Sequence, residues 1–94
     1  MLPDFKQFQA SLDQQVELAV AGQQLSARVV EVKALRKQDE ADRQPFSVVL
    51  VTEQAEPLDQ QIFSLQHPDL GRVELFLVPI GPRGEGMAYE AVIT

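Results

Sequence analysis

The chain has 94 residues, a net charge of −6, no cysteine and a single histidine. This length suits one domain with one modest core, so we expect a single domain over residues 1–94. The lack of cysteine excludes disulfides, thiolate metal sites and cysteine nucleophiles, and the acidic balance argues against nucleic-acid binding, which usually needs a basic face.

No apolar run approaches the length of a membrane span, and the first residues lack the basic and apolar regions of a secretory signal. We therefore expect a cytoplasmic protein without membrane insertion. Basic residues cluster only over residues 33–37, and Asp39, Glu40 and Asp42 follow at once. This mixture of charges is typical of a solvated loop rather than a phosphate-binding patch.

A short amphipathic helix is predicted from Pro3 to about Ala10. Leu2, Phe5, Phe8 and Leu12 recur at three- and four-residue spacing. We expect its aromatic face to close one end of a β core, because short isolated helices are marginal in water. The alternative is a detachable peptide that docks on a partner through its phenylalanines.

The next segment has the pattern of a β-hairpin. Val16, Leu18 and Val20 alternate with other residues as in a half-buried strand, and residues 21–24 contain Gly22, which can take positive φ in a turn. The return segment predicts a strand that leads away from this turn.

That return segment, Leu25 to Leu35, is ambiguous from its pattern alone. Its apolar residues fit either a helical face or a strand whose phase slips near Val29 and Val30. The preceding turn and the β-branched pair favour a strand, and the phase slip then predicts a β-bulge near Val30. A helix remains the alternative.

The middle of the chain alternates between loops and strands. Residues 36–44 form the longest polar loop, and Phe46 to Val51 is a strongly predicted strand. A second acidic loop covers residues 52–59, and residues 60–67 again alternate as a strand. A tight turn over residues 68–71 follows, since it contains proline, aspartate and glycine.

The longest apolar run, Gly71 to Pro82, is predicted to be a central strand. Its two faces both carry few charges, so we expect other elements to pack against each of them; the faces consist of Val73, Leu75 and Leu77, and of Glu74, Phe76, Val78 and Ile80. Pro79 is expected to mark its end. Gly81 to Gly86 is predicted to form a hairpin loop, and Met87 to Ile93 is predicted to be the last strand.

These elements give one short helix and about six short strands joined by short links. Short links connect antiparallel neighbours, because parallel pairing needs a long crossover. The predicted fold is therefore all-β, a mainly antiparallel small barrel or two-sheet roll with an N-terminal helix.

The single histidine restricts catalytic chemistry. A Ser-His-Asp arrangement would have to use His67 with Ser47 or Ser64, and neither serine stands in a nucleophile elbow. His67 lies at a strand end before Pro68, where a ring nitrogen can cap a free backbone group of the turn. We therefore interpret His67 as structural.

Two carboxylates, Glu74 and Glu90, lie in otherwise apolar strands and form the pair to inspect for acid–base chemistry. An outward face, or a partner such as Arg28 or Arg72, explains them without catalysis. One histidine cannot supply the usual zinc ligands, and no EF-hand spacing is present. We therefore expect no cofactor, no metal and no catalytic residue, and interpret the protein as not an enzyme.

From residue 45 onward the chain resembles a family of small bacterial proteins known only as a domain of unknown function. The resemblance rests on Pro45-Phe46-Ser47, Gln61, the run His67 to Gly71, the run Leu75 to Gly81, and Tyr89 to Val92. The first half matches in style only. The family implies no assigned activity; a loose association with genes for phage-tail-collar-like proteins implies an accessory of a tail-like or secreted assembly.

Two hypotheses of function follow. The first is a protein-interaction or assembly module with an exposed apolar patch or an open sheet edge, which binds a protein partner or itself. Its candidate contacts are Phe5, Phe8, His67, Glu74, Tyr89 and Glu90. The alternative is a small-molecule-binding barrel with an apolar pocket and His67 or Glu90 as its polar group. That pocket would be lined by Phe46, Phe63, Phe76 and Tyr89.

Overall fold

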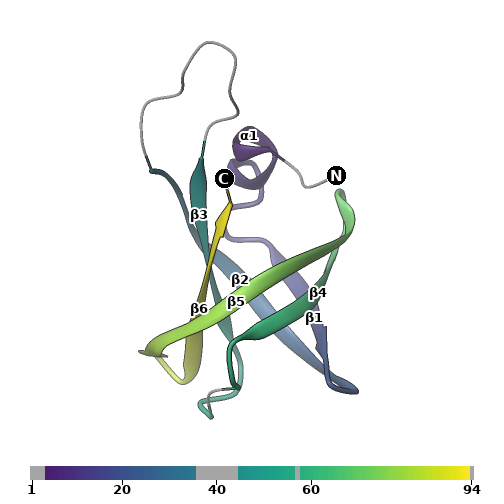
Figure 1. Cartoon of the computed structure of the whole chain (residues 1–94), viewed down its shortest axis with the longest axis vertical. Helices are drawn as coiled ribbons and strands as arrows, with labels where there is room; N and C mark the ends of the chain where they lie inside the picture. Colours follow the sequence, from purple (N-terminus) through teal and green to yellow (C-terminus); the bar gives the residue numbers. More distant parts are fainter. Residues whose placement is uncertain (1–3, 36–44, 57, 94) are drawn as a thin grey trace.

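The computed structural model describes residues 4–35, 45–56 and 58–93. Six antiparallel strands close into a barrel in the order β1-β2-β3-β6-β5-β4, with one short helix at one end (Figure 1). The elements are α1 (Phe5–Gln9), β1 (Gln15–Val20), β2 (Gln23–Ala34), β3 (Phe46–Thr52), β4 (Gln61–His67), β5 (Gly71–Arg83) and β6 (Gly86–Ile93). The barrel confirms the predicted fold class; the polar loop expected over residues 36–44 lies outside the described residues.

The β1–β2 hairpin follows from its alternation and its turn. Val16, Leu18 and Val20 are buried in the barrel. Ala21 and Gly22 both have positive φ, +49° and +79°. Two consecutive residues of this kind are the signature of the turn that matches the twist of a two-residue hairpin, so the strands return directly on each other.

The two longest strands, β2 and β5, are each shared between two neighbours. β2 pairs with β1 through residues 23–28 and with β3 through residues 27–34. β5 pairs with β4 through residues 71–77 and with β6 through residues 78–83. Each long strand therefore crosses from one side of the barrel to the other, which is visible in Figure 1.

The two halves of the barrel, β1–β2–β3 and β4–β5–β6, repeat one pattern. Each long strand shifts register once, between Val29 and Glu31 in β2 and between Pro79 and Gly81 in β5. The halves join through the antiparallel pairs β1–β4 and β3–β6. The strand pairing of one half therefore repeats, strand for strand, in the other. The shift in β2 confirms the bulge predicted at the slip in alternation, and the strand at this segment excludes the helical alternative.

Helix α1 closes one end of the barrel. Asp4 and Gln7 form a capping box, in which each side chain accepts the other's backbone N–H, at 2.9 and 2.8 Å. Phe8 is fully buried, and the rings of Phe5 and Phe8 each lie 5.7 Å from that of Phe46. The helix is thus the predicted lid, anchored by its aromatic face.

Two predictions about β5 were wrong. Its second face is not covered, since Phe76 and Ile80 are each 52% exposed; in a small barrel only the inner face meets the core. The strand does not end at Pro79 but continues to Arg83. The register shift beside Pro79 accommodates the missing N–H, since proline is tolerated at bulges. Closure of the barrel through β1 and β4 excludes an open sheet edge among these strands, which was one of the two alternatives expected of an interaction module.

Candidate functional site

His67 caps the turn after β4. It is buried, and its Nδ1 accepts the backbone N–H groups of Asp69 and Leu70 at 2.9 and 3.0 Å. Its Nε2 lies 2.7 Å from the Oγ of Ser11. Because Nδ1 accepts two hydrogen bonds, the ring proton belongs on Nε2, which donates to Ser11. The predicted structural role of His67 is confirmed.

The Ser11–His67 contact has the composition of a catalytic pair but not its polarity. A nucleophilic serine needs a ring nitrogen that takes its proton, whereas the nitrogen facing Ser11 is a donor. The Ser11 hydroxyl donates instead to the carbonyl of Gln7, at 3.1 Å, and the residue is buried. The pair therefore fastens the end of α1 to the turn after β4.

The four aromatic residues predicted to line one interior pocket do not lie together. Phe63 and Tyr89 pack with ring centroids 5.5 Å apart, and both are fully buried. The Tyr89 hydroxyl accepts the N–H of Leu58 at 2.8 Å. Phe46 packs against the lid helix, while Phe76 faces outward. Phe46, Phe63 and Tyr89 are core residues of the barrel and Phe76 is a surface residue, so the predicted pocket lining is wrong.

Glu74 and Glu90 do not form an acid–base pair. Glu90 lies opposite Val78 of β5, whereas Glu74 lies opposite Ser64 of β4. Glu74 and Val78 are four residues apart on one strand, which separates them by about 13 Å. Arg72 lies 3.9 Å from Glu74 and donates its Nε–H to the hydroxyl of Ser64 at 2.9 Å. Glu74 therefore belongs to an exposed ion pair with Arg72, which was one of the non-catalytic explanations given for it in the sequence analysis.

Within the described residues, no three histidine, aspartate or glutamate side chains gather in a way that could hold a metal ion. The acidic cluster of Asp39, Glu40 and Asp42 lies outside those residues. No helix in the described part of the chain is long and apolar enough to cross a bilayer.

An apolar surface lies on the outside of β4, β5 and β6. Ile62 and Phe76 are direct cross-strand partners, and Val78 and Ile80 continue along β5. Val92 lies on the outer side of β6, two positions beyond the partner of Val78. We call these five residues the apolar outer face. The exposed fractions of four of them are 60% for Ile62, 52% for Phe76, 52% for Ile80 and 57% for Val92.

The other half of the barrel carries a polar pair at the place equivalent to Ile62 and Phe76. Ser26 in β2 and Phe76 in β5 occupy equivalent positions, because each lies the same number of residues before the register shift of its strand. The cross-strand partner of Ser26 is Glu17, where Phe76 has Ile62. The Ser26 hydroxyl donates to Glu17 at 3.0 Å. The barrel fold therefore accommodates a polar pair at this position, so folding does not require the apolar pair Ile62–Phe76 at the equivalent one.

Among the residues that the structure describes, Glu90 is the one acidic side chain that lies opposite a member of the apolar outer face. It is half-buried between its two register partners, Val49 and Val78. Among the described residues, it has no hydrogen bond or ion pair. A half-buried carboxylate without a cation is a natural contact for a basic group of a partner.

Sequence reasoning named Phe76, Val78 and Ile80 as a face to be buried, and Phe76 also as part of a pocket lining. It missed Ile62 and Val92 as surface residues. Ile62 falls on the outer side of a strand whose inner side carries Phe63 and Leu65. An apolar residue out of phase with such an alternation was the available signal.

These features define a small closed antiparallel barrel with a lid helix and an apolar outer face. A scan of family models matches residues 3–93 to DUF6916, a domain of unknown function, and the chain belongs to that family. No curated protein and no solved structure matches the chain.

Proposed function

We propose that this domain is a cytoplasmic, non-enzymatic protein-interaction module that binds a partner through the apolar outer face. The observation that carries the proposal is the contrast between two equivalent places in one barrel. One holds the hydrogen-bonded pair Glu17–Ser26, and the other the exposed pair Ile62–Phe76. Neighbouring exposed apolar residues of this kind mark interaction sites, and binding gives them a role that the fold does not require.

The partner that fits best is a foreign protein with an apolar contact surface and at least one Lys or Arg. The cation would meet Glu90, which has no partner of its own in the described chain. A second copy fits less well, because it would bring another Glu90 and another net charge of −6 to the same interface. We propose a tail-like assembly, which the family resemblance implies, as the first context to search.

The barrel also limits how a partner binds. All six strands take part in a closed ring, so we expect contacts through side chains of the outer surface rather than by addition of a strand to an open edge. Phe76 is the expected anchor, because aromatic residues are enriched in the buried centres of protein interfaces, where a few residues carry most of the binding energy.

The test uses a variant that the molecule itself suggests. Ile62→Glu together with Phe76→Ser copies the Glu17–Ser26 pair onto the equivalent place, so the barrel should keep its fold and its melting temperature. A displayed peptide library is selected on the natural protein after depletion on this variant. The control variant, Glu17→Gln with Ser26→Ala, changes the equivalent polar pair instead.

The proposal predicts peptides that combine apolar side chains with Lys or Arg, bind the natural protein and the control variant, and lose binding to the Ile62/Phe76 variant. Light scattering should give a monomer. Binders without basic residues, or binders that do not distinguish the two variants, would contradict it. A dimer that dissociates in the Ile62/Phe76 variant would replace the foreign partner with a second copy.

A further inference from the structure

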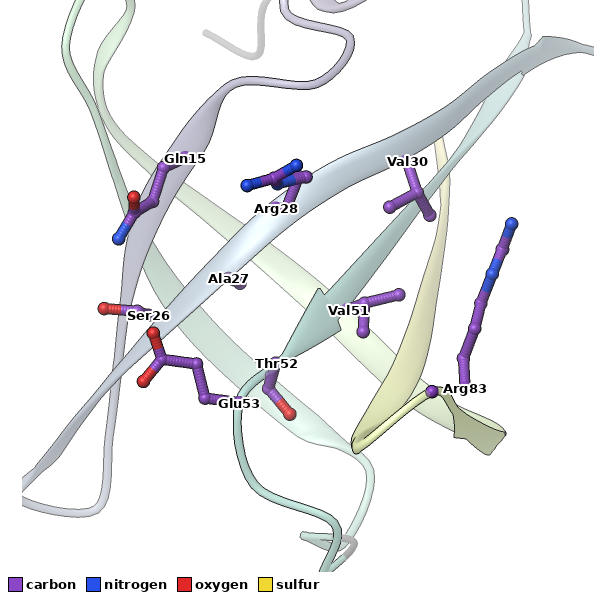
Figure 2. A pocket seen from close by; sticks show the side chains of 10 residues that line it. Gln15, Ser26, Ala27, Arg28, Val30, Val51, Thr52, Glu53 and Arg83 are labelled. Atoms are coloured by element: carbon purple, nitrogen blue, oxygen red, sulfur yellow. The ribbon is translucent and has the colours of Figure 1, made fainter.

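A hollow of about 350 Å³ lies on the outside of the barrel, and none of its lining residues belongs to the apolar outer face (Figure 2). It is formed where β2 and the end of β3 meet the turn between β5 and β6. The close approach depends on Gly86, since a Cβ at this residue would overlap the carbonyl oxygen of Thr52. This contact brings Arg83 and Gly84 to the rim of the hollow.

The hollow combines an apolar centre with charged sides. In Figure 2 the side chains of Val30 and Val51 stand between those of Arg28 and Arg83, and Glu53 lies at one end. Val30 falls within the register shift of β2, where a bulge re-aims a side chain. Two guanidinium groups thus flank an apolar patch that faces solvent.

Both guanidinium groups are available to a ligand. In the described part of the chain, neither Arg28 nor Arg83 forms an ion pair or a side-chain hydrogen bond, whereas Arg72 is held by Glu74 and Ser64. The lining therefore carries two cations against the single carboxylate of Glu53. The described lining thus has one more cation than carboxylate. Glu17, which accepts from the lining residue Ser26, lies beside it, so the two unpaired guanidinium groups rather than the overall charge favour an anion.

We propose that this hollow binds a small organic carboxylate with an apolar body. The planar guanidinium fork matches a carboxylate in geometry and charge. Val30 and Val51 provide the contact for the hydrocarbon part, and the volume lies in the range of small-molecule sites. The site shares no residue with the apolar outer face, so it neither depends on the proposed function nor supports it.

The experiment is a titration of the ¹⁵N-labelled protein with phenylacetate, followed by amide chemical shifts. Three matched probes separate the contributions: phenylacetamide lacks the charge, acetate lacks the apolar body, and benzylamine reverses the charge. Arg83→Gln and Arg28→Gln remove the proposed cations one at a time. Arg72→Gln removes a guanidinium outside the hollow and controls for net charge.

We expect phenylacetate to shift the amides of Val30, Val51 and Gly84 saturably, and each of the three probes to bind more weakly. Loss of one charge-assisted contact should weaken binding by about tenfold or more in Arg83→Gln or Arg28→Gln, with no change in Arg72→Gln. Absence of saturable shifts, shifts centred elsewhere, equal binding of phenylacetamide, or an equal effect of Arg72→Gln would each overturn the proposal.

Discussion

The role of His67 gives a sharp prediction for stability. His67→Leu introduces an apolar side chain of similar bulk and removes both ring nitrogens. The backbone N–H groups of Asp69 and Leu70 lose their acceptor, and the hydroxyl of Ser11 loses its donor. His67→Asn is the matched variant, because its side-chain oxygen can occupy roughly the place of Nδ1, while the Ser11 hydroxyl loses its donor and keeps only its bond to the carbonyl of Gln7.

The magnitude follows from the three hydrogen bonds. Each buried polar group left unsatisfied costs about 1 to 3 kcal/mol, and the two backbone groups are only partly buried, so the lower end applies. We expect His67→Leu to lower the free energy of unfolding by about 3 kcal/mol. His67→Asn should lose about half as much. In a domain of this size about 3 kcal/mol corresponds to a fall in melting temperature of more than about 10 °C.

Urea unfolding followed by circular dichroism measures these differences directly. Ser11→Ala, which removes only the contact to Nε2 and the bond to Gln7, provides the third point and should fall near His67→Asn. If His67→Leu unfolds within about 0.5 kcal/mol of the natural protein, the turn does not depend on this ring. Equal losses for His67→Leu and His67→Asn would show that the capping interaction is not what stabilises the turn.

Other substitutions test the packing around the barrel. Gly86→Ala should destabilise the protein by about 3 kcal/mol, because its Cβ would overlap the Thr52 carbonyl; thermal unfolding should show a much smaller loss of about 1 kcal/mol for Gly84→Ala, whose Cβ enters open space at a φ of +62°. Tyr89→Phe should lower the free energy of unfolding by about 1 kcal/mol, since it removes the acceptor of the Leu58 N–H. An unchanged urea midpoint would show that this bond adds no net stability.

The alternation of apolar and polar residues predicted most of the barrel strands, because each strand has one side facing the core and one side facing solvent. Even the bulge in β2 was visible, since two adjacent valines break the phase of the strand where one extra residue is inserted. The same logic failed on β5. Apolar residues on both sides of a strand indicate only that both sides can be covered, and in this barrel Phe76 and Ile80 are not covered by any described element.

Long-range contacts account for what the sequence did not reveal. Ser11 and His67 meet across a separation of 56 residues, and no local pattern connects them. The equivalence of Ser26 and Phe76 is likewise invisible without the strand register, because the two halves share geometry rather than a recognisable repeat. From the sequence, function was predicted only as a class, a protein-interaction module. The apolar outer face, which supports that proposal, was recognised only from the strand register and the exposure of single side chains.

The decisive measurement is the affinity of a selected basic, apolar peptide for the natural protein and for the variant Ile62→Glu with Phe76→Ser, by calorimetry. Removal of an aromatic anchor and its apolar neighbour should weaken binding by about a hundredfold, since each is expected to contribute about 1.4 kcal/mol or more. Glu90→Gln should weaken it by a smaller factor. A variant that remains folded and binds the peptide as tightly as the natural protein would contradict the apolar outer face as the docking site.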